Sequence, residues 1–241
     1  MSVRLKTIFL LPIAFFALAS FAFAQDASKV FKKASRSVVV VYVYDDEGKN
    51  TSQGSGVVIG KGEVVTNCHV IENGEKITVH TKTGQPKTAT LFRADWEKDV
   101  CLLNVPGLKS KKAKIRPSNS LKIGESVYAI GSPEGMDYSL SAGLVSQLRR
   151  DKKDSPPIIQ TDASVSSGSS GGGLFDKKGN LVGIVSFVLE EAQNIGFATP
   201  VEWIEEVRVS GIETDSTISS ETLIAGFRLL NLILANSLVD S

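Results

Sequence analysis

The residues best suited to chemistry lie in a glycine-rich segment, Gly168-Ser169-Ser170-Gly171-Gly172, between two strand-like stretches. Glycine lets the backbone turn tightly enough to point N–H groups at one position beside a serine hydroxyl. A serine hydroxyl is a weak nucleophile at neutral pH, so it also needs a base that takes its proton. Ser170 is therefore a candidate nucleophile, provided that the rest of the chain supplies that base.

Two histidines, His69 and His80, are the candidate bases, and both precede Ser170. His80 lies in the alternating run Lys76–Thr81, which predicts a strand with one exposed face and hence a solvated or half-buried imidazole. His69 follows an apolar strand at a short polar turn and is the better candidate. Asp99 opens the apolar run Val100–Val105, and an acid there could orient the imidazole; the alternative is a surface acid.

The order His69, Asp99, Ser170 discriminates between architectures. The segment from Gly168 to Gly172 also fits the G-x-S-x-G elbow of α/β-hydrolases, but in that fold the histidine follows the serine, and no histidine follows Ser170. A subtilisin-like order would place an aspartate first, and Asp45 and Asp46 lie in a polar loop. The observed order is that of chymotrypsin-type double barrels.

Several collinear blocks resemble trypsin-like serine proteases of the HtrA/Deg type, between about Ala34 and Val207. The blocks are Gly54–Ile59, Val64–Val70, Asp99–Leu103, Ala129–Gly135, Ser141–Ser146, Gln160–Ala163, Gly168–Gly172 and Asn194–Pro200. The resemblance implies an all-β fold of two six-stranded antiparallel β-barrels, with a short N-terminal helix and C-terminal helices.

The same resemblance implies roles for the candidate residues. Ser170 would be the nucleophile, His69 the general base and Asp99 its orienter, with the backbone N–H groups of Gly168 and Ser170 forming an oxyanion hole. Ser169 replaces the asparagine that is usual in the family, which a hole built from backbone donors should tolerate. Many relatives carry a PDZ module of about ninety residues, and we expect none to fit after the protease domain.

The substrate pocket is also expected from the resemblance. Val165, before the nucleophile, and the strand Ser186-Phe187-Val188 would line the pocket for the residue preceding the scissile bond. No acid occurs between Ala163 and Ser169, so we expect a modest apolar pocket for Val-, Ala- or Leu-sized residues. The strand should also offer backbone hydrogen bonds to an extended substrate.

The two cysteines flank the proposed base and orienter. If His69 and Asp99 are hydrogen-bonded, their backbones are close, and Cys68 and Cys101 come within disulfide reach. Two buried free thiols are the alternative. A zinc site formed by both cysteines with His69 and His80 would consume the base and leave the Ser170 turn unexplained, so we expect no metal and no cofactor.

The chain is divided into three parts by its hydrophobic pattern. Residues 1–24 resemble a signal peptide, with Arg4 and Lys6, the apolar run Ile8–Phe23 and an A-x-A-type site at its end; an uncleaved anchor is the alternative. Residues 25–207 form the predicted protease domain, with barrel one at about 37–105 and barrel two at about 125–200. Residues 208–241 form a tail with an apolar helix, which we expect to pack on the protein or to contact a membrane. A bacterial periplasmic or secreted protein is expected.

Charge excludes some partners. With 27 Lys and Arg against 26 Asp and Glu, the net charge of +1 gives no indication of nucleic-acid binding. The basic runs Lys109–Lys114 and Arg149–Lys153 contain no aromatic residues and are expected to be solvated loops, the first of them linking the barrels.

Two functional classes remain open from the sequence. The first is an endopeptidase that acts on unfolded or exported proteins through an acyl-enzyme. The second is a latent or inactive scaffold that binds polypeptides like a chaperone. A homo-oligomer is possible, but no residues that would form one can be identified.

Overall fold

The structure is a computed structural model that describes residues 27–72, 74–132, 138–150, 152–166, 168–188 and 195–210; the side chains of Phe187 and Val188 are also outside the described part. The expected signal peptide and apolar C-terminal helix lie outside these residues. Among the described residues, no helix is both long and apolar enough to cross a membrane.

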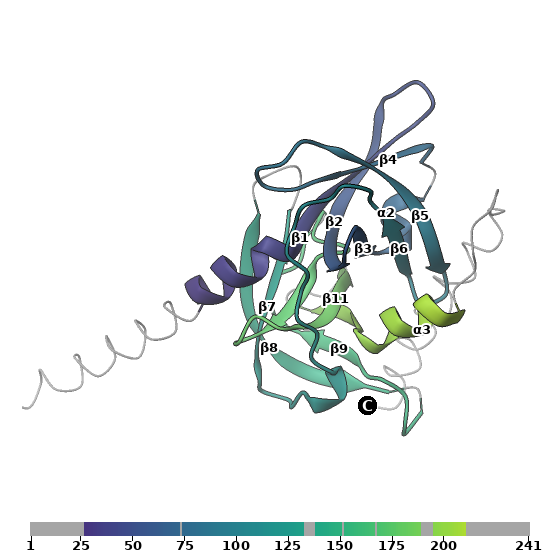
Figure 1. The fold of residues 1–241 in the computed structure, drawn as a ribbon. Coiled ribbons are helices and arrows are strands. Elements are labelled where there is room, and N and C mark those ends of the chain that lie inside the picture. Colours follow the sequence, from purple (N-terminus) through teal and green to yellow (C-terminus); the bar gives the residue numbers. More distant parts are fainter. Residues whose placement is uncertain are drawn as a thin grey trace, which may run out of the picture.

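The first six strands close into one antiparallel barrel, in the order β1-β2-β3-β6-β5-β4 (Figure 1). Its interior is filled mainly by valines, because alternate residues of each strand face inward. The strands are β1 (Val38–Tyr44), β2 (Asn50–Gly60), β3 (Glu63–Thr66), β4 (Lys76–His80), β5 (Lys87–Asp95) and β6 (Val100–Asn104).

The last six strands close into a second antiparallel barrel, in the order β10-β11-β12-β9-β8-β7. Its interior is formed by a separate apolar cluster that includes Val127, Leu174 and Val185. The strands are β7 (Ser126–Gly131), β8 (Ser139–Arg149), β9 (Ile158–Thr161), β10 (Gly173–Asp176), β11 (Leu181–Val188) and β12 (Gly196–Pro200). The two-barrel fold predicted from the sequence is confirmed.

A third apolar cluster lies between the barrels and joins them. It brings Val57 and Leu102 of barrel one together with Tyr128, Phe175 and Ile184 of barrel two, all of them buried. The barrels are therefore one packed unit, and residues at their junction can be positioned by both.

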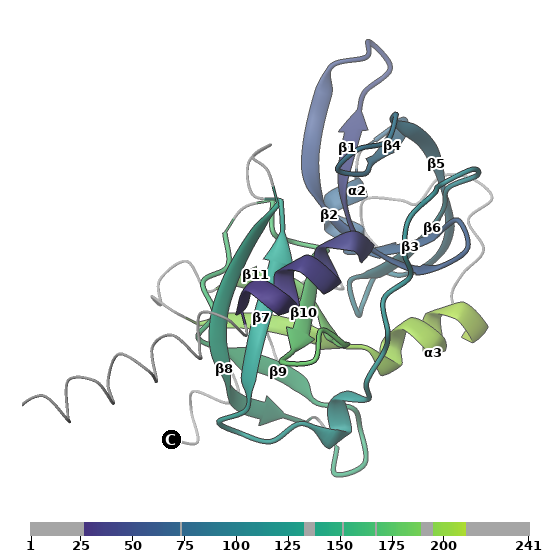
Figure 2. The same cartoon turned by 60° about the vertical axis from the view of Figure 1, so that its left-hand side comes forward.

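Helices cover this junction on the outside. The N-terminal helix, residues 27–34, continues into η1 (Ser35–Ser37) and lies across the two barrels (Figure 2). The C-terminal helix α3 (Glu202–Ser210) follows barrel two but packs on β5 and β6 of barrel one. The ion pair between Arg208 and Glu63 (2.9 Å) fixes α3 to that barrel.

Two short helices complete the fold. The turn η2 (Ser118–Ser120) precedes barrel two, and α2 (Cys68–Ile71) follows β3. The sequence predicted only a polar turn at α2. One helical turn forms there because Val70 and Ile71 bury their side chains in barrel one.

Candidate active site

His69 is positioned by α2, at the end of β3. The imidazole Nδ1 lies 2.7 Å from Oδ2 of Asp99, and the backbone N–H of His69 donates to Oδ1 of the same carboxylate at 3.0 Å. Both oxygens of Asp99 thus hold one residue, at its ring and at its backbone. With Nδ1 occupied by the carboxylate, Nε2 is the nitrogen that can take a proton from a nucleophile.

Asp99 has an unusual backbone conformation for a residue with a side chain. Its φ is 55°, in the left-handed region, which aspartate tolerates better than most residues. The backbone turns there between β5 and β6, and the N–H of Asp99 donates to the carbonyl of Trp96 at 3.3 Å. This turn directs the carboxylate toward His69 in α2 rather than along the strand. The sequence pattern alone does not indicate this direction.

The turn that carries Ser170 belongs to barrel two but is bound to barrel one. The backbone N–H of Ser55 donates to the carbonyl of Ser170 at 2.8 Å, and the Ser55 hydroxyl donates to the carbonyl of Gly168 at 2.7 Å. At Gly171, where φ is 82°, a Cβ would lie only 2.1 Å from the carbonyl oxygen of Ser55. Glycine is required at this position by both the conformation and the close approach of the barrels.

Ser186 connects the outer members of the candidate triad. Its hydroxyl donates to Oδ2 of Asp99 at 2.9 Å, and its carbonyl accepts the hydroxyl of Ser170, also at 2.9 Å. Ser186 lies where the pairing of β11 with β12 shifts register, which re-aims its side chain. The sequence analysis expected Ser186 to line the substrate pocket and did not predict its contact with Asp99.

Asn67 is a further residue that the sequence analysis missed. Its side-chain oxygen accepts the N–H of Gly171 at 2.6 Å, and its side-chain nitrogen donates to the carbonyl of Asp99 at 2.8 Å. The side chain is fully buried, at 0% exposure. A single amide therefore joins the segments that carry all three candidate residues. The sequence did offer one sign of this role: Asn67 is a polar residue between the apolar strand β3 and the candidate base His69.

Two backbone N–H groups beside the Ser170 hydroxyl are candidates for an oxyanion hole. Gly168 has a φ of 83°, which turns the chain just before the nucleophile. Within the part of the chain that the structure describes, the N–H groups of Gly168 and Ser170 donate to no protein acceptor. Unused donors in a tight turn are what a developing oxyanion requires.

The disulfide predicted between Cys68 and Cys101 is confirmed. The two residues are buried, their Cα atoms are 5.0 Å apart, and the bridge links the residue before His69 to the strand that follows Asp99. Both sulfur atoms are consumed by the bridge, so neither is free to serve as a zinc ligand. The bridge restrains the two segments that hold the base and its orienter.

Removing this bridge should destabilise the protein strongly. Since it closes a loop of 33 residues, we expect Cys68→Ala with Cys101→Ala to lower the free energy of unfolding by about 3–4 kcal/mol in urea denaturation. Dithiothreitol should destabilise the wild type similarly and leave the double variant unchanged. If the free energy of unfolding of the double variant lay within about 1 kcal/mol of the wild-type value, a stabilising role for the bridge would be contradicted.

The electrostatic surroundings raise the pKa of His69. Burial opposes protonation of the ring, but the hydrogen bond that the ring donates to Asp99, the charge of Asp99 and the charge of Glu72 together outweigh it. A raised pKa means that the protonated ring stabilises the folded state. This contribution is complete below the unfolded-state pKa of about 6.5 and is lost as the pH rises through the higher folded-state pKa.

We expect the pH dependence of peptide hydrolysis to follow this shift. A general base must be neutral, so the acidic limb of kcat/KM should have its midpoint above about pH 6.5. Glu72→Gln should lower that midpoint because it removes one of the charges that raise the pKa. Glu75→Gln, an exposed neighbour, is the matched control and should leave it in place. A wild-type midpoint below pH 6 would argue against His69 as the base.

The predicted substrate-pocket residues are only partly described. Val165 is half-buried and packs on the core of barrel two, and a Cβ at Gly196 would lie 3.1 Å from its Cγ2. The side chains of Phe187 and Val188 lie outside the described part of the structure. The substrate pocket therefore stays a prediction.

The second histidine is in a different part of barrel one. His80 is half-buried on β4, its Nε2 lies 3.0 Å from the Thr78 hydroxyl, and its ring packs edge-on against Tyr42. Burial lowers the pKa of His80. These contacts fit the side chain expected on an alternating strand.

Residues 54–184, more than half of the chain, match the family of trypsin-like peptidase domains. The chain belongs to this family. The matched range contains His69, Asp99 and Ser170, and the resemblance identified from the sequence blocks is thereby confirmed. Twelve strands in two closed barrels agree with that assignment.

Curated relatives support the same family. A protein of Ectopseudomonas mendocina named "Probable periplasmic serine endoprotease DegP-like" is 40% identical over 157 residues, which cover 63% of this chain and 33% of the relative. A protein of Buchnera aphidicola subsp. Acyrthosiphon pisum named "Probable serine protease do-like" is 33% identical and covers 77% of this chain and 41% of its own length. The chain thus spans between about a third and about two fifths of the length of these relatives.

Solved structures of trypsin-like peptidases superpose on the same region. A serine endoprotease from Yersinia pestis has a TM-score of 0.68 and 31% identity, covering 76% of this chain and 65% of that structure. The structure titled "HtrA-type protease AlgW with tripeptide" has a TM-score of 0.70 and 29% identity, and the match covers 76% of this chain and 62% of that structure.

Proposed function

We propose that this protein is a serine endopeptidase in which His69, Asp99 and Ser170 form the catalytic triad. The observation that carries the proposal is the 2.7 Å contact between Nδ1 of His69 and Asp99, beside a serine whose turn is held by both barrels. That arrangement directs Nδ1 to the carboxylate, so Nε2 is the nitrogen that would act as the base that an unactivated serine needs.

The proposed reaction follows the usual two stages of acyl transfer. Ser170 Oγ bonds to the carbonyl carbon of the substrate while its proton passes to Nε2 of His69. The negative charge moves to the carbonyl oxygen, where the N–H groups of Gly168 and Ser170 stabilise it. The C–N bond then breaks, and His69 gives its proton to the leaving amine. Water repeats the attack on the acyl-enzyme and releases the carboxylic acid.

Ser170 must change its hydrogen bond before it can react. Its hydroxyl donates to the Ser186 carbonyl in the resting structure. Rotation about its Cα–Cβ bond would release that carbonyl and turn the proton toward the imidazole. The resting contact is the specific observation that favours the second candidate function, a latent protease fold that binds polypeptides without turnover.

Polypeptides in an extended conformation are the proposed substrates. Pairing of β10 with β11 ends at Ile184, so in the described part of the chain the edge of β11 at 186–188 that faces away from β12 has no strand partner. A peptide could add there as a strand, with little dependence on its sequence. Unfolded proteins offer such segments most readily.

The residue before the scissile bond would occupy the space near Val165 and Gly196. Val165 packs closely against Gly196, and these two residues bring no charge to the space, which supports a preference for Val, Ala or Leu. Profiling with a peptide library is the test. Efficient cleavage after arginine would overturn this part of the proposal.

The proposed location is the periplasm or the extracellular space. The signal-like residues 1–24 and the disulfide support an exported protein, since structural disulfides form in oxidising compartments. Several relatives are themselves named periplasmic serine endoproteases.

Labelling with a fluorophosphonate probe, followed by peptide mapping, tests the function directly. An active enzyme should be modified at Ser170 and not at the adjacent Ser169, and it should degrade a reduced, unfolded protein faster than the same protein folded. Folded protein that neither reacts with the probe nor degrades unfolded protein would favour the latent scaffold.

A further inference from the structure

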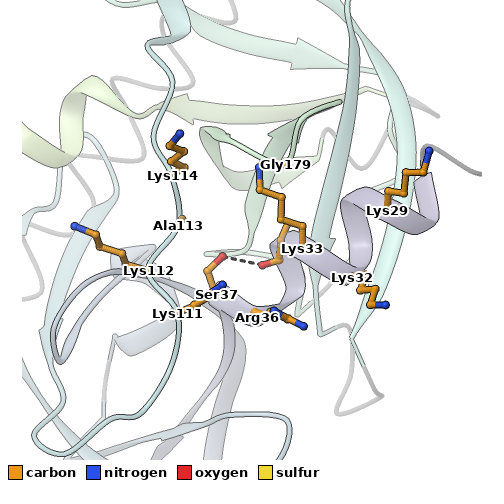
Figure 3. Close-up of a pocket in the computed structure, with 11 residues that line it drawn as sticks. Lys29, Lys32, Lys33, Arg36, Ser37, Lys111, Lys112, Ala113, Lys114 and Gly179 are labelled. Carbon is orange, nitrogen blue, oxygen red and sulfur yellow. Dashed lines mark hydrogen bonds between the residues drawn. The ribbon is translucent and has the colours of Figure 1, made fainter.

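A cavity of about 540 Å³ lies outside the candidate active site, between the N-terminal helix and the segment that links the barrels (Figure 3). Ala34 of the helix and Ala113 of the linker line it with small apolar side chains. The hydroxyl of Ser37 donates to the carbonyl of Ala34 at 2.7 Å and so is turned toward the backbone. The polar groups of this cavity are therefore mainly those of its basic side chains.

The N-terminal helix and η1, which continues it, contribute four of those side chains: Lys29, Lys32 and Lys33 from the helix and Arg36 from η1. Their spacing of three, four and seven residues places them along one side of the helical segment, while Val30 is buried in the junction of the barrels. Lys33 reaches across the cavity and donates to the carbonyl of Lys178 in the turn between β10 and β11. The helix is thus anchored, with its remaining cations exposed.

The linker contributes three more cations, Lys111, Lys112 and Lys114, all exposed. Its backbone is fixed from both sides, because the N–H of Ala113 donates to the carbonyl of Val58 and the carbonyl of Lys114 accepts the N–H of Leu181, each at 2.7 Å. The sequence analysis expected this basic run to be a solvated loop, and its lysines are indeed exposed in a segment without helix or strand. The two backbone hydrogen bonds fix this loop as one wall of the cavity.

The positive charge here is concentrated and uncompensated. Seven basic side chains line the cavity, and none of its described lining residues is acidic. The ion pairs found within the described ranges involve other basic residues, namely His69, Lys98, Arg116 and Arg208. Since the whole chain has a net charge of only +1, this clustering produces a local positive potential that an anion would relieve.

We propose that this cavity binds a phosphate-bearing anion, carried either by a phospholipid headgroup or by a soluble polyphosphate. In Figure 3 the exposed heads of Lys29, Lys32 and Lys112 point away from one another, but these long side chains can turn toward a compact group with two or more negative charges. The apolar run Ile8–Phe23 ends six residues before Lys29, the first residue that lines the cavity, which is at most about 21 Å of extended chain. The proposal shares no residue with the candidate triad and does not depend on it.

A matched pair of variants tests the proposal in the full chain. The cavity variant combines Lys29→Gln, Lys111→Gln and Lys112→Gln, which removes three charges from the cavity. It keeps Lys33, whose side chain binds the carbonyl of Lys178. The control variant combines Lys49→Gln, Lys76→Gln and Lys82→Gln, which removes three exposed charges of barrel one that do not line the cavity. The two variants have the same net charge, so a difference between them reports the site and not overall electrostatics.

Binding is measured with two probes. Tripolyphosphate is titrated by calorimetry, and vesicles of phosphatidylcholine with or without 30% phosphatidylglycerol are used in flotation. The cavity variant should bind on the order of 100-fold more weakly, since each cation near an anionic group contributes about fivefold. The control variant should bind within a few-fold of the wild type.

The outcomes separate the two sources of phosphate. Tight binding of tripolyphosphate that is lost in the cavity variant assigns the site to a soluble phosphate. Preference for phosphatidylglycerol vesicles without tripolyphosphate binding, again lost in that variant, assigns it to a headgroup. Failure of the wild type to bind either probe, or equal loss in both variants, would overturn the proposal.

Discussion

Ser170→Ala is expected to lower kcat for peptide hydrolysis on the order of 10⁶-fold and to abolish labelling by a fluorophosphonate. The reason is the loss of the only group proposed to bond to the substrate carbonyl carbon. The fold should survive, because the barrel contact at this position uses the Ser170 carbonyl, which alanine retains. The lost hydroxyl bond to Ser186 should reduce stability by only about 1 kcal/mol.

Ser169→Ala is the matched control, since it changes the neighbouring hydroxyl in the same turn. Ser169 contacts Ser166 through its backbone N–H, which alanine retains, so the kcat of this variant should stay within a few-fold of the wild type. Loss of activity in Ser169→Ala with retention in Ser170→Ala would mean that the nucleophile is misassigned.

Asp99→Asn is expected to lower kcat by about 10⁴-fold, the size of the effect known for the corresponding change in a Ser-His-Asp enzyme. The amide cannot compensate the charge of an imidazolium, and its NH₂ group would favour the wrong tautomer of His69. Asparagine tolerates the left-handed φ of 55°, whereas alanine would add backbone strain to the chemical effect. Steady-state kinetics and thermal unfolding should be measured together.

The control for this variant is Asp95→Asn, a change of the same type at the end of β5. The Asp95 carboxylate pairs with Lys98 at 3.0 Å and accepts the N–H of Lys98, whereas the His69 ring contacts Asp99. Its activity should be close to that of the wild type. An Asp99→Asn enzyme within tenfold of the wild type would exclude Asp99 as the orienting acid.

The strands were predictable because their signal is local. Runs such as Val38–Tyr44 and Ser126–Gly131 combine β-branched residues with turn signals at both ends, and the structure has strands with those bounds. Other strands extend beyond the apolar runs that indicate them. The strand β2, for example, begins at Asn50, four residues before the block Gly54–Ile59. The extra residues of β2 are polar and pair with β1, which hydrophobic patterning does not indicate.

The contacts of the site were less predictable because they depend on tertiary geometry. The left-handed backbone of Asp99, the register shift at Ser186 and the bridging amide of Asn67 arise only when distant strands are in place. The pairing of Cys68 with Cys101 was accessible, since it follows once His69 and Asp99 are taken to be neighbours.

The hydrogen bonds from Ser55 and Asn67 to the turn around Ser170 have a consequence for the order in which the protein matures. Barrel one alone would present the candidate base and its acid without a nucleophile. Barrel two alone would lack the groups of barrel one that donate to the carbonyls of Gly168 and Ser170 and that accept the N–H of Gly171. Hydrolytic capacity would therefore arise only after both halves have folded and docked. A newly made chain, whose own unfolded segments would be good substrates, is protected from itself during that interval.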